Sequence, residues 1–341
     1  MELAVTLPYA DDALLQGGAI ELSRAADRLG YHSIWVAEAW GFDAFMVLTM
    51  LAGQTEHIRL GTSIVNVYSR SPALIGQSVA TLDALSGGRA ILGLGASGPQ
   101  VIEGWHGVPY RKPVQRTREA VDIVRQVLRR ERVTFDGEIF QLGMGLKLLN
   151  HPVRETVPIV IAALGPRNVE MAATVADGWM PTLYMPSRAA EVFGPMLAAG
   201  AAARSPELGP LSVIVPASVG VFADEGQGAA AKSSLKPLLA LYVGGMGSRD
   251  QNFYNDLVKR YGYEAEAATI QDLYLSGQRE QAVAAVPDEL VDEVSAIGSA
   301  TQVREALGRF AAAGVDVLMV SLVAPDASSQ LELLELLPSL V

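Results

Sequence analysis

Cysteine is missing from this chain, and charged and aromatic side chains are scarce. None of the 341 residues is cysteine, and only 18% are Asp, Glu, Lys or Arg. Without thiols there is no disulfide, thiolate metal centre, iron–sulfur cluster or cysteine nucleophile. The four histidines include no pair at i, i+4 spacing, and no H-E-x-x-H motif occurs. The sequence therefore predicts no metal site.

Long apolar runs and an excess of basic charge are absent as well. No uninterrupted apolar stretch reaches the roughly 18 residues that a membrane span needs. The first residues do not show the basic and then apolar segments of a secretion signal. The formal net charge of −11 argues against nucleic-acid binding, which depends on Lys and Arg that neutralise phosphates. We therefore expect a cytoplasmic protein that binds neither membranes nor nucleic acids.

Hydrophobic residues, in contrast, make up half of the chain, and short apolar runs alternate with amphipathic stretches. This alternation is typical of a parallel α/β fold. The expected strands are Leu3–Pro8, Ser33–Ala37, Ile58–Val67, Ala90–Gly95, Ile159–Ala163, Gly178–Leu183, Ser212–Val219 and Val315–Leu322. Eight strand–helix units favour a closed (β/α)8 TIM barrel over an open sheet. The first strand continues into Pro8–Asp11 without a G-x-G-x-x-G turn, which argues against a Rossmann domain.

Two connections are longer than a barrel needs. One runs from Ser97 to Pro113, with a further connection at Phe135–Pro158. The longest lies between the seventh and eighth strands, from about Phe222 to Gly314, and its pattern is helical. No Pro- or Ser-rich linker marks a boundary. We therefore expect one domain over residues 1–341, with a helical insertion at about 222–314.

Active sites of α/β barrels lie at the C-terminal ends of the strands, and this rule selects candidate residues. Glu38 follows the second strand, and Glu103 and His106 lie in the loop after the fourth. These three side chains are the candidates for proton transfer. For Glu38 the alternative is a structural carboxylate that hydrogen-bonds neighbouring strands.

The turn after the fifth strand, Ala162–Pro166, leads directly into a helix. Backbone N–H groups at a helix N-terminus favour phosphate, both as unsatisfied donors and through the helix dipole. An ordinary strand-to-helix turn has the same pattern, so both interpretations stay open. Because the chain lacks a thiol, a metal cluster and a G-x-S-x-G nucleophile motif, demanding chemistry at this face requires an organic cofactor.

Three segments resemble the luciferase-like superfamily, and in particular its F420-dependent oxidoreductases, which include the methylenetetrahydromethanopterin reductases. They are Leu82–Arg89, the run LGLGASGPQVIEGWHG at Leu92–Gly107, and Ala163–Val169 followed by Ala176–Trp179. The similarity extends over nearly the whole chain. It implies an insertion-bearing barrel that holds the deazaflavin coenzyme F420, or alternatively FMN, at its C-terminal face.

The resemblance also implies where the cofactor lies. It places a non-prolyl cis peptide at Ser63-Ile64, behind the cofactor ring, and brings Ser97 and Gly98 to the pyrimidine edge of the ring. The full set of predicted cofactor contacts is Ser63, Ile64, Asn66, Ser97, Gly98, Gln100, Ala162, Ala163, Leu164, Gly165, Met180 and Thr182.

One departure from the family pattern bears on the reaction. F420-dependent sugar-phosphate dehydrogenases carry an Asp-His pair after the second strand, with the His as base, and here Glu38-Ala39 stands in its place. The missing imidazole argues against alcohol oxidation. It predicts a reductase in which reduced F420 gives hydride to an activated C=C, C=N or C=O bond of a small-molecule substrate, with Glu38 or Glu103 supplying or relaying a proton.

Two alternatives remain at this stage. One is an FMN-dependent monooxygenase on the same barrel, and the other is a noncatalytic flavin-binding homologue. The resemblance further implies a homodimer or a higher homo-oligomer.

Overall fold

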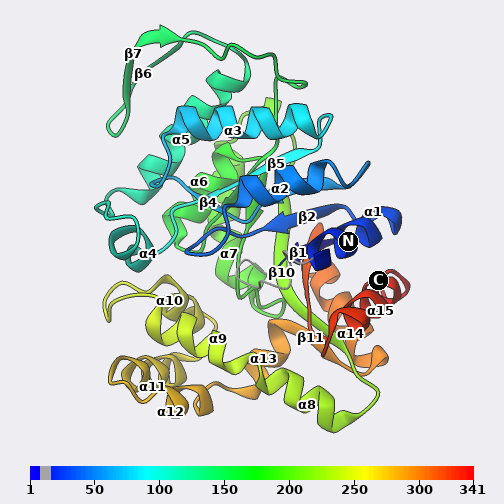
Figure 1. Ribbon diagram of the computed structural model, residues 1–341. Coiled ribbons are helices and arrows are strands. Elements are labelled where there is room, and N and C mark those ends of the chain that lie inside the picture. Colours follow the sequence, from blue (N-terminus) through cyan, green and yellow to red (C-terminus); the bar gives the residue numbers. More distant parts are fainter. Residues whose placement is uncertain (8–16) are drawn as a thin grey trace.

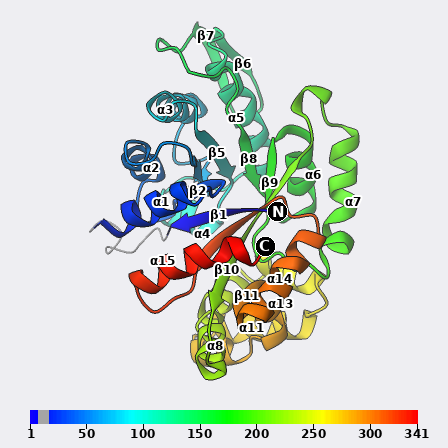
Figure 2. The ribbon, with the colours of Figure 1, turned by 90° about the vertical axis from the view of Figure 1, so that its right-hand side faces the viewer.

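A closed barrel of parallel strands, wrapped by helices, forms the centre of the computed structural model, which describes residues 1–7 and 17–341 (Figures 1 and 2). The barrel strands are β1 (Glu2–Leu7), β2 (Ser33–Val36), β3 (Arg59–Thr62), β5 (Ala90–Gly95), β8 (Ile159–Ala162), β9 (Gly178–Met180), β10 (Ser212–Val221) and β12 (Val317–Leu322). Each strand pairs in parallel with the next, and the β9–β10 and β12–β1 pairings close the ring. The predicted (β/α)8 TIM barrel is confirmed. Pro8–Asp11, at the end of the first predicted strand, lies outside the described residues.

The barrel strands are apolar because side chains on both of their faces are buried. The barrel interior is filled by Ala4, Trp35, Ile91, Val160, Met180, Ile214, Val317 and Met319. Gly61 makes room for the largest of these side chains, since a Cβ atom at this position would lie 2.4 Å from the Trp35 ring. The interior is therefore a packed core rather than a pore, as is usual for this fold.

The helices that cover the barrel are α1 (Ala19–Arg28), α2 (Ala44–Ala52), α3 (Pro72–Leu85), α4 (Pro99–Gly104), α5 (Pro113–Leu128), α6 (Pro166–Val175), α7 (Ala189–Ala202), α14 (Ala300–Ala312) and α15 (Ala327–Leu336). The start of α3 shows why they begin where they do. The Ser71 hydroxyl accepts the Leu74 N–H at 3.2 Å, and Pro72 occupies the first turn, where a missing N–H costs nothing.

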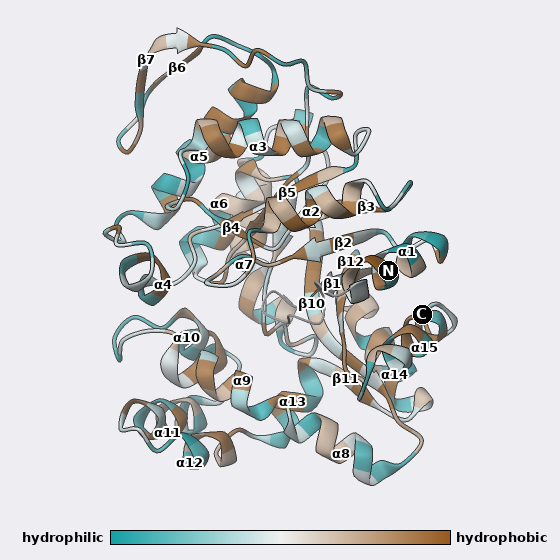
Figure 3. Ribbon diagram, in the orientation of Figure 1, coloured by the Kyte–Doolittle hydropathy of each residue, from teal (hydrophilic) through white to brown (hydrophobic). Residues whose placement is uncertain are grey.

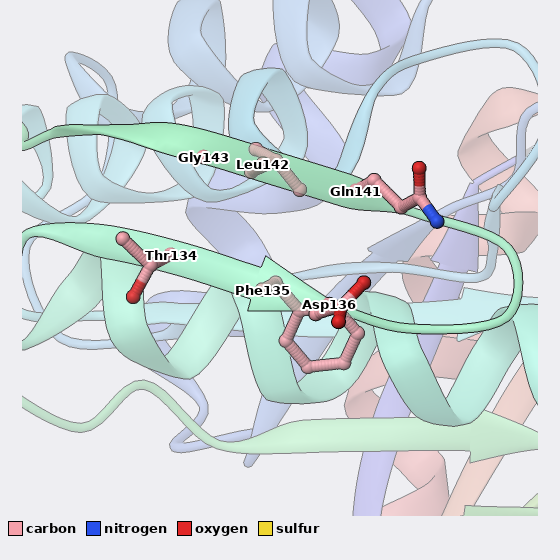
Figure 4. Close-up of a pocket in the computed structure, with 6 residues that line it drawn as sticks. All are labelled: Thr134, Phe135, Asp136, Gln141, Leu142 and Gly143. Carbon is pink, nitrogen blue, oxygen red and sulfur yellow. The ribbon is translucent and has the colours of Figure 1, made fainter.

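The connection from α5 to β8 contains an antiparallel hairpin, β6 (Val133–Asp136) and β7 (Gln141–Leu146). Its base packs on Ile123 and Val127 of α5. Met144 and Leu146 are exposed, and Figure 3 shows brown, apolar segments alternating with pale ones along the hairpin. A pocket of about 390 Å³ lies between its strands, lined by Thr134, Phe135, Asp136, Gln141, Leu142 and Gly143 (Figure 4). These residues are not at the strand ends of the barrel, so this pocket is separate from the predicted cofactor face.

The segment between β10 and β12 is mostly helical. It contains α8 (Glu225–Ser233), α9 (Lys236–Ala240), the π-helical turn η3 (Leu241–Gly245), α10 (Phe253–Arg260), α11 (Glu264–Leu275), α12 (Arg279–Ala284) and α13 (Asp288–Glu293). Figures 1 and 2 both show these helices on the side of the barrel opposite the β6–β7 hairpin. A short strand, β11 (Ser295–Gly298), then pairs in parallel with the outer part of β10 and leads into α14. We refer to residues 222–294 as the insertion. None of the described helices combines the length and the apolar character needed to cross a membrane.

Candidate active site

The third predicted strand, Ile58–Val67, is divided into β3 and β4 (Val65–Asn66), and the cis peptide Ser63-Ile64 lies between them. The predicted cis bond is therefore confirmed. The break turns the Ile64 side chain toward β5, where a Cβ atom on Gly95 would lie 3.0 Å from Ile64 Cδ1 and 3.5 Å from Ala162 Cβ. The glycine thus leaves room for both neighbours at the strand ends.

Strand register brings further predicted cofactor residues to the same level. Asn66 of β4 pairs with Gly95 of β5, and Ala162 of β8 pairs with Met180 of β9. Ile64, Asn66, Ala162 and Met180 therefore lie side by side at the C-terminal ends of consecutive strands. Thr182 is half-buried two residues beyond β9. This face is where α/β barrels hold their ligands.

The Asn66 side chain stabilises the turn that follows β4. Its Oδ1 accepts the N–H groups of Tyr68 at 3.0 Å and Ser69 at 2.7 Å. These two donors fix the amide orientation, so Nδ2 is the atom that faces His106 Nε2, 3.4 Å away. Asn66 thereby holds His106, a candidate for proton transfer, at the barrel mouth.

The loop after β5 connects the barrel to the insertion. Ser97 has the left-handed backbone conformation, with φ of 57°, and Gly98 is the N-cap of α4. With the Gln100 amide oriented to satisfy its neighbours, its nitrogen donates to Met246 O at 3.2 Å and its oxygen accepts Gly247 N–H at 3.0 Å. The structure therefore places Gln100 as a link between this loop and the insertion.

The turn Ala162–Gly165 leads into the N-terminus of α6, as predicted. Gly165 is the N-cap, no side chain caps the helix, and no acidic residue stands in its first turn. The free N–H groups and the helix dipole therefore favour an anion here. Trp179 supports the turn, since its Nε1–H donates to Ala163 O at 2.9 Å.

Arg260 of α10 reaches this turn from the insertion. Its Nη2 donates to Leu164 O at 2.7 Å, whereas its Nη1 is buried without a hydrogen-bond partner among the described residues. Asn168 Oδ1, in the first turn of α6, is also buried without such a partner. A buried guanidinium nitrogen needs an acceptor. Arg260 cannot be predicted from the sequence, because no local pattern relates it to a turn 96 residues earlier.

The two predicted catalytic carboxylates differ in their surroundings. Glu38 forms a two-pronged pair with the Arg70 guanidinium and accepts Ala44 N–H at 3.0 Å. Arg70 also donates to Asp43 at 2.6 Å. Glu103 lies exposed on α4, and its Oε1 accepts Tyr110 N–H at 2.9 Å. Glu38 is therefore a fixed ion-pair partner, and Glu103 is open to water. Among the described residues, no group of three or more His, Asp and Glu side chains could hold a metal ion.

Residues 1–317 match the family model of the luciferase-like monooxygenases. The chain belongs to this family. It is 40% identical over 336 residues to a provisionally named coenzyme F420-dependent oxidoreductase of Mycobacterium tuberculosis, covering 94% of this chain and 95% of that one. It is 30% identical over 326 residues to the 5,10-methylenetetrahydromethanopterin reductase of Archaeoglobus fulgidus, covering 93% and 94% of the two chains.

The fold of the family is also seen in the coenzyme F420-dependent tetrahydromethanopterin reductase of Methanopyrus kandleri. Its structure superposes with a TM-score of 0.82 at 24% identity, covering 100% of this chain and 99% of that one. The resemblance inferred from Leu82–Arg89 and Leu92–Gly107 is thus confirmed.

Proposed function

We propose that this protein is a coenzyme F420-dependent reductase that transfers hydride from reduced F420 to an activated C=C, C=N or C=O bond of a small molecule. The F420-dependent class is supported by the relative from Mycobacterium tuberculosis, which shares the full length of the barrel and the insertion. When bound, reduced F420 supplies a hydride from its deazaflavin ring.

The observation that carries the proposal is the N-terminus of α6, which favours a bound anion. The uncapped N-terminus of α6 and the Arg260 guanidinium meet at the Ala162–Gly165 turn, where Arg260 Nη2 donates to Leu164 O at 2.7 Å and the buried Nη1 has no partner among the described residues. Arg260 and the N–H groups of α6 would hold the phosphate of F420. Ile64, Ala162 and Met180 would lie against the ring, because they share one level at the strand ends.

The residues after β2 support reduction as the direction of the reaction. Ala39 offers no base, and the Glu38 carboxylate is paired with Arg70, so this position lacks a free group that would remove a proton from an alcohol. Reduction does not need such a base. We assign Glu38 to positioning the mouth of the barrel, and Glu103 to relaying a proton from water.

Titration of the purified protein with F420, and separately with FMN, tests the cofactor assignment through quenching of tryptophan fluorescence. We expect micromolar binding of F420 and much weaker binding of FMN. Preference for FMN would replace the proposal with a monooxygenase, and binding of neither would leave a noncatalytic homologue. Oxidation of reduced F420, followed at 420 nm with a panel of activated alkenes, imines and ketones, then tests the direction.

A further inference from the structure

Four tyrosines stand where the insertion meets the barrel mouth, and we name Tyr68, Tyr110, Tyr242 and Tyr254 the tyrosine cluster. Tyr68 follows β4 and Tyr110 precedes α5, and their rings stack with centroids 5.3 Å apart and an interplanar angle of 23°. Tyr242 of η3 and Tyr254 of α10 form the second pair, with centroids 4.6 Å apart. The pairs meet at the loop after β5, because Tyr110 contacts Ser97 in that loop and Gln100 of the same loop contacts Met246 and Gly247, which follow η3.

Hydrogen bonds fix most of the cluster. The Tyr110 hydroxyl donates to Ser97 O at 3.1 Å, which ties the ring to the predicted edge of the cofactor. The Tyr68 hydroxyl donates to Arg111 O at 3.0 Å. On the insertion, Asn252 Oδ1 accepts the Tyr254 N–H at 3.0 Å. The aromatic faces are therefore held in place before any ligand arrives, which lowers the entropic cost of binding one.

Tyr254 differs from its neighbours in that its hydroxyl has no hydrogen bond to any residue that the structure describes, although its side chain is partly accessible. Burial, with smaller contributions from Tyr242 and Tyr110, raises the pKa of Tyr254. The phenol is therefore protonated at neutral pH and able to donate a hydrogen bond.

Two guanidinium groups beside the cluster already lie against rings or carboxylates. The Arg116 guanidinium lies 4.5 Å from the Tyr68 ring centroid and 5.1 Å from that of Phe140. Arg70 is paired with Glu38 and Asp43. An anionic substrate group would also be repelled by the exposed Glu103 carboxylate, which acts electrostatically on Tyr68. Tyr68 is buried between Tyr110 and Arg116, so the partly exposed rings of the other three tyrosines are the ones that favour an offset-stacked planar molecule.

We propose that the tyrosine cluster binds the substrate, and that the substrate is a flat, uncharged, conjugated carbonyl compound whose oxygen accepts a hydrogen bond from Tyr254. The inference rests on the proposed reductase function, because the Tyr110–Ser97 contact sets the cluster beside the predicted cofactor edge. A hydrogen bond from Tyr254 would orient the carbonyl, and the stacked rings would hold its plane.

The test measures binding without turnover, by calorimetric titration of the protein loaded with oxidised F420. The probe is menadione, a planar uncharged quinone, and 2-methylnaphthalene is the matched compound without oxygens. We expect Tyr254→Phe to weaken menadione binding about 5-fold, the worth of one hydrogen bond, and to leave 2-methylnaphthalene unaffected. Tyr242→Ala should weaken both. Tyr263→Phe, the same kind of change elsewhere on the insertion, should weaken neither.

Equal menadione affinity in the unmodified protein and in Tyr254→Phe would overturn the inference. So would binding of glucose 6-phosphate to the unmodified protein as tightly as menadione. Should Tyr254→Phe fail to fold, the unmodified protein still decides, because menadione binding no tighter than 2-methylnaphthalene refutes the hydrogen bond. F420 affinity is measured separately in each protein. If the unmodified protein does not bind F420, the reductase proposal is refuted. If it binds F420 but not menadione, only the proposed substrate class is refuted.

Discussion

The Glu119 carboxylate holds the turn of the β6–β7 hairpin, and its replacement should destabilise the fold measurably. Glu119 lies on α5 and is 2% exposed. One oxygen accepts Gln115 Nε2 at 2.8 Å and Glu138 N–H at 2.9 Å, and the other accepts Ile139 N–H at 3.0 Å and Phe140 N–H at 2.9 Å. All four donors therefore converge on a single buried anion.

In Glu119→Gln, either orientation of the amide turns its NH2 group toward two of these donors. Two hydrogen bonds to a charged acceptor are lost, each worth about 1.5–3 kcal/mol, and the remaining two are weakened. We expect the free energy of unfolding to fall by about 3–6 kcal/mol. Urea unfolding followed by circular dichroism measures it, and hydrogen exchange of residues 133–146 shows whether the hairpin opens first. Glu131→Gln, which removes an exposed pair with Arg129, should cost less than about 0.5 kcal/mol.

The same site predicts a pH dependence. Burial acts to raise the pKa of Glu119, but the hydrogen bonds from Gln115, Phe140, Ile139 and Glu138 outweigh it and lower the pKa. A lowered folded-state pKa means that the stabilisation is complete above the unfolded value of about 4.3 and is lost as the pH falls through the lower folded value. The difference between Glu119→Gln and the unmodified protein should therefore shrink below about pH 4. An unchanged urea midpoint at pH 7, with hairpin exchange as slow as before, would refute the reasoning.

Three further predictions follow from the barrel mouth and the core. Arg260→Met should weaken F420 binding about 10-fold in a fluorescence titration while leaving thermal unfolding within a few degrees, and an unchanged affinity would remove Arg260 from the anion site. Gly93→Ala should prevent the barrel from folding, because the new Cβ would lie 1.8 Å from a backbone oxygen, whereas Gly194→Ala meets nothing within 4 Å and should fold normally by circular dichroism. Glu38→Gln should lower turnover without moving its pH profile if Glu38 only positions Arg70, and a displaced profile would assign proton transfer to Glu38.

The parts of the fold that the sequence predicted are those with a repeating pattern. Short apolar runs followed by amphipathic helices identify the barrel, and the strand-end rule then selects the face on which Ile64, Asn66 and Ala162 lie. The cis peptide came only from the family resemblance, since no physical feature of the Ser63-Ile64 dipeptide distinguishes it from other strand residues.

The unpredicted parts depend on contacts between distant residues. β11 has four residues between helical segments, too few to show a period. β7 contains Gly143 and Gly145, which lower its strand propensity, so its sequence does not distinguish it from the connection around it. Glu38 was visible as a carboxylate after a strand, but its pairing with Arg70 became evident only when the barrel placed their strands together.

The two ends of the insertion meet beside β10, so evolution can replace the insertion while the barrel is kept. The chain leaves β10 after Val221 and comes back at β11, where Phe222 N–H donates to Gly298 O at 2.9 Å. A segment whose two ends meet can be exchanged while the strands of the barrel keep their pairing. A replacement would need to keep partners for Gln100, for the Leu164 carbonyl and for the Leu183 carbonyl, which accepts the Tyr261 hydroxyl at 3.0 Å. New substrate preferences can then be acquired without rebuilding the strand ends of the barrel.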